Sequence, residues 1–413
     1  MKTFYTLCLL LATTGLFAQK NLYVAKSGKQ YGYINEHCEW VVKPEYDRVF
    51  KMDGNVGVVM KSDRHGLINR SGELVLAVEH DYLKAGGGMV MFRKNEKFGY
   101  YSPEGEEMIA AKYVKAKPFK EDRAMVLKGT EWIYVDKEGN EYSVGSNMKL
   151  HNFSEGYGLV LDKTKGKFGY VNDQGEWTIE AQYDKAKDFH EGFARVLVGD
   201  KWGYIRQNGE WLVEPKYGNT FDFQEKHARV LTDNGYTFLK ADGTELNLGK
   251  VDKVHDFTEG VARVIVGKKV GLIDGDGNWL AEPQFESVKP MVRGYIPAAQ
   301  KGKWGFINSK GEWIIQPAYA HVAYPSQGMV PVMFKKLWGF VDESGNIVIE
   351  PAYDNLFELP PMGIASYNVL KQPLYQNGIA RAKSKKQWNL IDTQGQQVCS
   401  EPLDYIGVTM IED

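Results

Sequence analysis

The residues best placed to do chemistry are paired acids in a recurring Asp-Phe-x-Glu-Gly element, clearest at residues 188–192 and 256–260. Two neighbouring carboxylates could act as the acid and base of glycoside hydrolysis, or contribute to a calcium-binding loop. The element lacks the dense oxygen ligands of a calcium loop, however, and it recurs along the chain. Asp at a turn start and Glu beside a short helical turn are ordinary capping residues. We therefore interpret these acids as capping groups.

Other residue types that carry chemistry also lack the required spacing. None of the eight histidines belongs to a His-x-x-x-His pair or to a cysteine-rich cluster, so the usual metal-ligand spacing is absent. The three glycines at residues 86–88 are not followed by Lys-Ser/Thr, as a phosphate-binding loop requires. A Gly-x-Ser-x-Gly nucleophile motif is absent from the sequence. We expect no catalytic residues, no metal site, no cofactor and no enzymatic activity.

The elements that must position these residues come from an internal repeat. A glycine, usually preceded by an aromatic residue, marks most of the repeat units. The marked glycines are Gly32, Gly66, Gly99, Gly169, Gly203, Gly271, Gly305 and Gly339, with Ile133, Thr237 and Asn389 in three degenerate units. The spacing is 33 to 36 residues except for a final step of 50. This period predicts about eleven copies of one unit.

Each unit has the pattern of three antiparallel strands. Residues 193–198 predict a first strand, residues 201–205 a second and residues 210–217 a third. An Asx-x-x-Gly turn joins the second strand to the third, and Pro215 indicates a strand end or an edge. The connector to the next unit has room for one helical turn. We predict an all-β tandem array.

All ten tryptophans occupy two offsets in the repeat, either directly before the marked position or eight residues after it. A side chain that recurs with the repeat is most simply a packing residue, and an aromatic ring buries about 150–250 Å². The adjacent glycine would let a ring lie against the backbone. The structural signature is therefore Trp202, Gly203, Trp211, Trp304, Gly305, Trp313, Trp338 and Gly339.

The units at residues 201–217, 303–319 and 337–353 resemble the WG-repeat (KWG-repeat) family of bacterial tandem-repeat proteins. The resemblance rests on the Trp-Gly pair, the turn glycine, the Pro-x-Tyr ending and the Asp-Phe-x-Glu-Gly connectors, and it covers roughly residues 20–408. It implies all-β repeats and usually no assigned catalytic chemistry.

The array can be an open superhelix or a closed propeller-like ring. The chain starts with a first strand and shows no obvious blade shared between its ends, which favours the open form. Cys38 lies in the first unit and Cys399 in the last, so an open array would hold them too far apart for a disulfide. We expect an open array with two free, buried thiols. The closed ring is the alternative.

Residues 1–18 predict a cleavable signal peptide, because Lys2 precedes an apolar run that ends before Ala18. The run is too short to span a bilayer, and no later segment approaches the necessary length. The mature array, residues 19–413, is therefore expected to be secreted or periplasmic and not membrane-spanning. Over the full sequence, 51 Lys and Arg nearly balance 53 Asp and Glu, which gives no electrostatic reason to expect nucleic acid as a partner.

The long final step places an irregular insertion at about residues 358–376, and insertions in repeat arrays often lie on the binding face. The candidate partner contacts there are Pro360, Pro361, Met362, Tyr367 and Tyr375. We expect a monomeric, exported, non-catalytic scaffold that binds another protein in the cell envelope or outside it. The alternative is a glycan or cell-wall binding module, which would need tryptophan or tyrosine rings in solvent.

Overall fold

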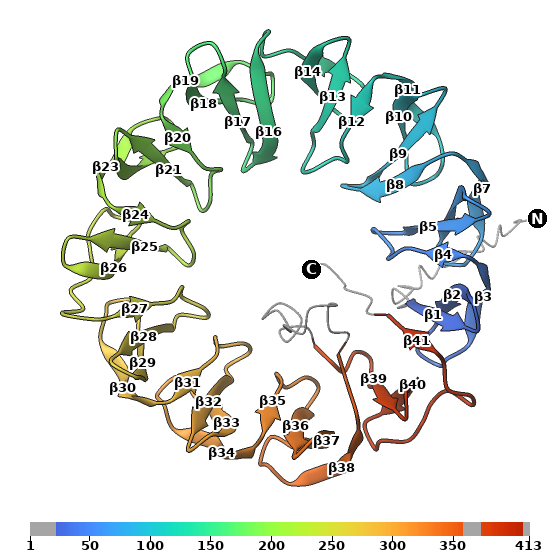
Figure 1. Ribbon diagram of the computed structural model, residues 1–413, viewed down its shortest axis with the longest axis vertical. Helices are drawn as coiled ribbons and strands as arrows, with labels where there is room; N and C mark the ends of the chain where they lie inside the picture. The colour runs from blue at the N-terminus through green and yellow to red at the C-terminus, as the bar shows by residue number, and fades with distance from the viewer. Residues whose placement is uncertain (1–21, 358–372, 408–413) are drawn as a thin grey trace, which may run out of the picture.

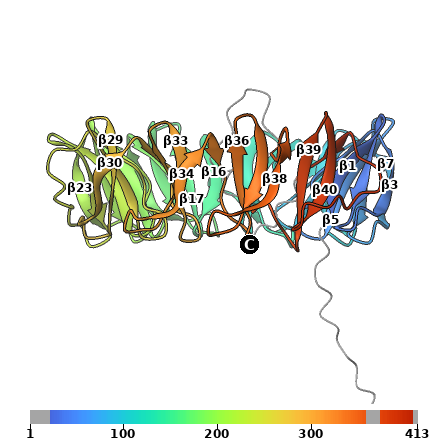
Figure 2. The same cartoon turned by 90° about the horizontal axis from the view of Figure 1, so that it is seen from below.

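The computed structural model describes residues 22–357 and 373–407, which form eleven small antiparallel sheets. The sheets stand side by side in a closed ring, and the side view shows a ring one sheet thick (Figures 1 and 2). The described residues contain no helix, and so no helical segment that could cross a membrane. We call each sheet a blade and number the blades 1 to 11 from the one that contains β1. The predicted all-β array of antiparallel repeats is confirmed.

A regular blade has four strands, not the three expected. Blade 6 has the order β20 (Lys185–Ala186), β21 (Phe193–Val198), β22 (Lys201–Arg206) and β23 (Trp211–Tyr217). The three long strands are those predicted, but the connector forms the short strand β20 instead of a helical turn. We call the four the inner, first, second and third strands. Figure 1 shows the inner strands nearer the ring axis and the third strands on the circumference.

The other inner strands are β4 (Arg48–Val49), β8 (Leu83–Gly86), β12 (Lys115–Ala116), β16 (Met148–Ser154), β24 (Asn219–Thr220), β27 (Lys253–Val254), β31 (Ser287–Val288), β35 (His321–Val322) and β41 (Tyr405–Ile406). The other first strands are β1 (Tyr23–Ser27), β5 (Val56–Lys61), β9 (Met89–Lys94), β13 (Ala124–Lys128), β17 (Tyr157–Asp162), β25 (His227–Thr232), β28 (Ala262–Val266), β32 (Ile296–Gln300), β36 (Val330–Phe334) and β39 (Ile379–Ser384).

The other second strands are β2 (Gln30–Ile34), β6 (Arg64–Asn69), β10 (Lys97–Tyr101), β14 (Glu131–Val135), β18 (Lys167–Val171), β26 (Gly235–Lys240), β29 (Lys269–Ile273), β33 (Lys303–Ile307), β37 (Leu337–Val341) and β40 (Gln387–Asp392). The other third strands are β3 (Trp40–Tyr46), β7 (Leu74–His80), β11 (Glu107–Tyr113), β15 (Glu141–Tyr142), β19 (Trp177–Tyr183), β30 (Trp279–Phe285), β34 (Trp313–Tyr319) and β38 (Ile347–Tyr353). Among the described residues, blade 7 lacks a third strand and blade 11 consists of β39 and β40 alone.

The marked glycines are needed because the third strand bulges against the second. In blade 6, Trp202 pairs with Tyr217 and Tyr204 pairs with Val213, so three residues of β23 face Gly203 alone. A Cβ on Gly203 would lie 2.7 Å from the carbonyl oxygen of Val213, a distance that no side chain tolerates. Pro215 lies in this bulge on an edge strand, where a missing N–H is harmless. The expectation that the glycine makes room for a ring is wrong in this blade, because backbone fills the space.

The hydrophobic core lies between neighbouring blades rather than at one centre. One cluster joins Leu159 and Tyr170 of blade 5 to Ala186 and Phe189 of blade 6, and similar clusters recur around the ring. The tyrosine that follows a marked glycine is buried and also makes a polar contact across the interface. The hydroxyl of Tyr204 donates to the carbonyl oxygen of Phe221 in blade 7, at 2.7 Å. Each blade is therefore stabilised mainly by its neighbours.

The ring closes at blade 1, and the expected open array is wrong. Strand β41, from the C-terminal end, pairs with β1 as the inner strand of blade 1. The backbone N–H of Gly28 donates to Asp404 at 2.8 Å, and Cys38 and Cys399 form a disulfide with their Cα atoms 5.1 Å apart. The expected free thiols are therefore wrong too. The alternative, a closed propeller-like ring, is the observed form.

Candidate functional site

The most regular polar feature of the ring is the turn that joins each inner strand to the first strand, which we call the tip. In blade 6 the tip is Glu191-Gly192, and both residues have positive φ, 51° and 83°. Two residues with positive φ close a tight hairpin whose twist matches the strands. Figure 1 shows β8 and β16 running toward the ring centre, where their tips lie. Glutamate is an unusual choice for this conformation, so its side chain needs an explanation.

Each tip glutamate in one half of the ring clamps the next blade. The carboxylate of Glu155 accepts the backbone N–H groups of Glu191 and Gly192 at 2.5 and 2.8 Å. The same arrangement joins blade 4 to blade 5 and continues to blade 9. The carboxylates belong to Glu121, Glu155, Glu191, Glu225 and Glu259. These acids do cap backbone amides, but the amides belong to the next blade and not to a helical turn.

The aspartates of the same element contact arginines of the preceding blade. The guanidinium of Arg195 donates to Asp222 at 2.5 Å and also to the carbonyl oxygen of Thr220. Arg229 makes the equivalent pair with Asp256. In blades 7 and 8, both acids of the element are thus engaged in contacts between blades. These acids therefore stabilise the interfaces between neighbouring blades.

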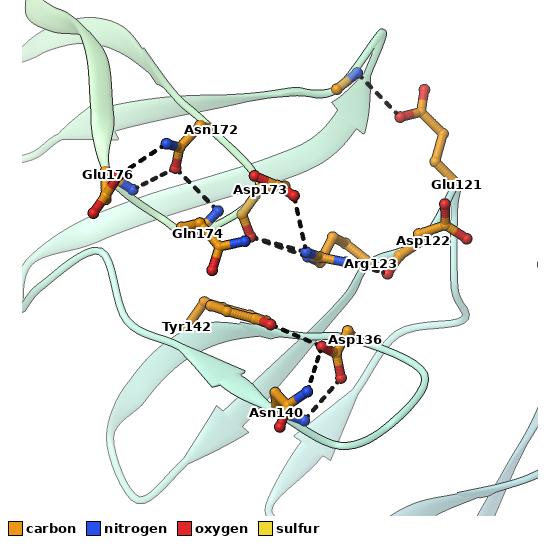
Figure 3. Close-up of polar contacts among 11 residues, drawn as sticks. Glu121, Asp122, Arg123, Asp136, Asn140, Tyr142, Asn172, Asp173, Gln174 and Glu176 are labelled. Carbon is orange, nitrogen blue, oxygen red and sulfur yellow. Dashed lines mark hydrogen bonds and ion pairs between the residues drawn. The ribbon is translucent and has the colours of Figure 1, made fainter.

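Figure 3 shows a related contact between blades 4 and 5. Arg123 lies 4.9 Å from the ring of Tyr142 and donates to the carbonyl oxygen of Asp173 at 3.1 Å. The hydroxyl of Tyr142 donates to Asp136 at 2.8 Å. Burial raises the pKa of Asp136, but the hydrogen bonds from Asn140 and Tyr142 outweigh it and keep the pKa below its usual value. An arginine in this position joins the tip to the turn of the next blade.

Three histidines lie partly buried between blades. Burial, followed by the nearby charge of Arg263, lowers the pKa of His255 to about 4. Burial also lowers the pKa of His65 and of His151. The described residues contain no group of three His, Cys, Asp or Glu side chains that could hold a metal ion. The low pKa values therefore reflect packing in the blade interfaces.

The signature tryptophans occupy two kinds of place. Trp211 is 37% exposed and meets Tyr183 of the preceding blade edge-on at 6.0 Å, as Trp313 meets Phe285 at 5.8 Å. These rings, eight residues after the marked glycine, pack between blades.

The tryptophans before the glycine pack against the hydrophobic clusters between their own blade and the next. Trp202 and Trp304 are half-buried, and the ammonium of Lys289 lies 4.7 Å from the Trp304 ring. Trp338 is buried and packs edge-on against Phe357. Gly305 and Gly339, like Gly203, lie against third-strand carbonyl groups. The rings do not form a regular row of exposed stacking surfaces.

Most of the predicted partner loop lies outside the described residues. Four of its candidate contacts lie there: Pro360, Pro361, Met362 and Tyr367. Tyr375 is described and buried, so it is not the exposed contact that was expected. Its hydroxyl donates to the carbonyl oxygen of Asp392 at 2.9 Å. Tyr375 precedes the tip Asn377-Gly378 by two residues, the same spacing as Phe189 before Glu191-Gly192. That spacing was a sequence signal for a core position.

The sequence analysis also did not predict a set of exposed apolar side chains on the third strands. They occur at the two repeat positions eight and nine residues after the marked glycine. The set consists of Leu74, Met108, Trp211, Ile314, Ile347 and Val348. Recurrence in the repeat predicted packing for the tryptophans at the first of these positions, whereas these positions lie on the outer strand of each blade.

A closed ring of tandem β repeats is the class of protein that the fold and the clamped tips define. The family described as WG containing repeat matches this chain in seven segments, which together cover more than half of it. The segments are residues 31–64, 98–132, 168–202, 202–236, 271–304, 304–338 and 338–359. The chain belongs to this family. A search of the curated proteins found no match.

Solved structures give distant likenesses. A eukaryotic initiation factor matches with a TM-score of 0.43 and 10% identity over 94% of this chain and 98% of its own. PorZ, a surface component of the type-IX secretion system of Porphyromonas gingivalis, matches with a TM-score of 0.24 and 9% identity over 93% and 60%. The extracellular domain of a hybrid two-component system from B. thetaiotaomicron matches with a TM-score of 0.22 and 10% identity over 93% and 65%. These scores are too low to carry an argument about function.

Proposed function

We propose that this protein is an exported, non-catalytic ring scaffold that binds another protein through the outer strands of its blades. The observation that carries the proposal is the pair of exposed aliphatic side chains on β38. Ile347 is 50% exposed and Val348 is 43% exposed. Ile314 lies on β34 of the adjacent blade and is also exposed, and Figure 1 places β34 and β38 next to each other on the circumference.

Two physical arguments favour a protein partner at this surface. Large exposed apolar side chains recur on the outer strands of several blades, and exposed apolar surface often marks an interaction site. Strand β38 is also the edge of its sheet, so one row of its backbone N–H and C=O groups has no partner strand among the described residues. A protein partner can add a strand to such an edge and cover the aliphatic side chains at the same time.

Export and the absence of catalysis are part of the proposal. The predicted signal peptide supports export, and so does the disulfide between Cys38 and Cys399, because disulfides persist in oxidising compartments. Three of the acids that first suggested chemistry, Glu191, Asp256 and Glu259, are engaged in contacts between blades. This engagement favours a structural role for them.

A quantitative pull-down from an envelope extract tests the proposed surface. The double variant Ile347→Lys/Val348→Lys should lose the protein that the tagged mature ring captures, because two charges replace the aliphatic contact. Thr178→Lys is the matched control, since Thr178 is exposed on β19 at the same repeat offset as Val348. Equal capture by the parent and the double variant, with unchanged melting curves, would contradict the proposal. So would the absence of any protein specific to the parent.

A further inference from the structure

Blade 7 departs from the repeat in a way that creates a hollow. Its marked pair is Tyr236-Thr237 instead of Trp-Gly, and it has no third strand among the described residues. Residues 245–249 take the place of that strand but pair with β26 only briefly, through a bridge between Leu239 and Glu245 and a hydrogen bond from Leu246 N–H to the carbonyl oxygen of Phe238. In a regular blade, a bulged seven-residue strand covers this side of the second strand.

The hollow is a cavity of about 270 Å³ between β26 and residues 245–249. Its volume lies just below the range of roughly 300–1,000 Å³ that is typical of sites for drug-sized ligands. The cavity is therefore suited to one small ring rather than to a long chain or a large cofactor.

The cavity wall is mostly polar. Asn234, Asn247 and Thr232 are among the residues that line it. The side-chain amide of Asn234 has no hydrogen-bond partner within the part of the chain that the structure describes. The side-chain oxygen of Asn247 accepts a long contact from Gly249 N–H at 3.4 Å, which leaves its NH₂ group available as a donor. These groups can both donate hydrogen bonds and accept them.

The same wall offers an apolar face. Tyr236 and Leu248 are half-buried there, and both also pack against the core that contains Trp279. A tyrosine ring beside amide and hydroxyl groups suits a ligand that has C–H groups on one face and hydroxyls at its edge.

The charges around the cavity disfavour an anion. Lining residues with a cationic side chain are absent, and Glu245 is the one acid in the lining set. The carboxylate of Glu245 is already engaged by the Lys216 ammonium and the Tyr217 hydroxyl, both at 2.7 Å. Burial raises the pKa of Glu245, but the Lys216 contact outweighs it and keeps the group ionised at neutral pH. An uncharged polar ligand fits this setting better than a phosphate or a carboxylate.

We propose that the blade 7 cavity binds one neutral sugar ring, such as a terminal residue of a glycan. The amides of Asn234 and Asn247 bind its hydroxyls, and the ring of Tyr236 contacts its apolar face. The site lies three blades away from β38 in the ring of eleven, so it is independent of the protein-binding surface proposed above.

Titration of the mature ring with neutral methyl glycosides, followed by saturation-transfer NMR, tests the site. The probes are methyl glucoside, mannoside, galactoside and N-acetylglucosaminide, with inorganic phosphate and glucuronate as charged comparisons. At least one neutral glycoside should bind saturably with a dissociation constant in the millimolar range. The double variant Asn234→Ala/Asn247→Ala should weaken that binding at least about tenfold, because it removes both side-chain amides that line the cavity.

Asn152→Ala is the matched control, since Asn152 is an exposed asparagine on β16, outside the cavity. This variant should bind like the parent. The proposal is overturned if none of the neutral glycosides binds saturably, if the double variant binds as well as the parent, or if only the charged compounds bind. The double variant changes two exposed side chains, so its melting curve should match that of the parent and a folding defect would not obscure the result.

Discussion

At the scale of single residues, the repeated glutamate of the tips joins one blade to the next. Glu191 has a positive φ, a conformation that disfavours most side chains, and its carboxylate accepts the N–H groups of Glu225 and Lys226 at 2.7 Å each. Arg293 occupies the corresponding tip position in blade 9, where the run of carboxylate clamps ends. The identity of one residue per unit therefore decides whether an interface is clamped.

Removing one clamp should weaken one interface. We expect Glu191→Ala to lower the free energy of unfolding by about 1–2 kcal/mol, because two charge-assisted hydrogen bonds are replaced by bonds to water. Glu191→Gln keeps one acceptor oxygen and should lose less. Denaturant unfolding measures the stability, and hydrogen exchange at the amides of Glu225 and Lys226 locates the change. Unchanged exchange at these amides in Glu191→Ala would refute the clamp.

The partly buried His255 should make the ring sensitive to acid. Its pKa is about 4 in the folded chain, chiefly through burial, and about 6.5 in an unfolded chain. Between these values the unfolded state binds more protons, so stability is present above pH 6.5 and falls as the pH decreases toward 4. His255→Phe should reduce this fall by about 1–2 kcal/mol, a value discounted for partial exposure.

Phe221 of blade 7 occupies the repeat position that corresponds to His255, so this chain already contains phenylalanine at that position. Unfolding measured at pH 7.5 and at pH 4.5 gives the difference. His37→Gln, which replaces an exposed histidine, is the control. A parallel pH profile for His255→Phe would contradict the prediction.

At the scale of elements, the close approach of the second and third strands sets the shape of the blade. In blade 9, Trp304 pairs with Tyr319 and Phe306 with Ile315, so the third strand bulges over Gly305. A Cβ on Gly305 would lie 2.3 Å from the carbonyl oxygen of Ile315. The Trp-Gly pair therefore combines a ring that packs between blades with a position where the next strand can come into backbone contact.

We expect Gly305→Ala to destabilise the ring by about 2–4 kcal/mol, because β33 and β34 must move apart. Gly218→Ala is the control, since its added Cβ would have no neighbour closer than 3.8 Å and should change stability by less than about 1 kcal/mol. Urea unfolding of both variants provides the comparison. Similar midpoints for the two would show that the bulge relaxes without cost.

Long, strongly patterned elements were predictable from the sequence, and short ones were not. The 34-residue period and the alternation in segments such as residues 193–198 correctly predicted the repeat and its long strands. The inner strand Lys185–Ala186 has two residues, too few to show a period. Strand Tyr405–Ile406 has the same length, so nothing in its sequence indicated that it completes blade 1. The blade 7 cavity depends on the path of residues 245–249, although the degenerate pair Tyr236-Thr237 marked the unit.

At the scale of the whole molecule, the pairing of β1 with β41 and one disulfide connect the ends of the ring. Cys38 and Cys399 lie in blades 1 and 11, 361 residues apart in sequence. They pack with Trp40 and Trp388 in one hydrophobic cluster. Whether these cysteines could meet depended on the rotation between successive blades, a quantity that local sequence patterns do not contain.

Opening this link should loosen the two blades that it joins. We expect Cys38→Ala/Cys399→Ala to lose about 2–5 kcal/mol of stability, because the unfolded chain is no longer constrained by a long covalent loop. Hydrogen exchange should rise first in β1 and β41. Thiol titration of the parent in denaturant without reductant should find no reactive thiol. Two reactive thiols would show that the bond does not form.

Closure also fixes how many blades the ring can have. Eleven equal interfaces must share one full rotation, so each turns the chain by about 33°, less than in propellers of four to eight blades. A ring of ten would need about 36° at every interface, a small change that all the interfaces would have to make together. Adding or losing a single unit is therefore not a local event here, as it would be in an open solenoid. The rotation between successive blades sets the number of repeats, and that number can change only if the rotation at every interface changes as well.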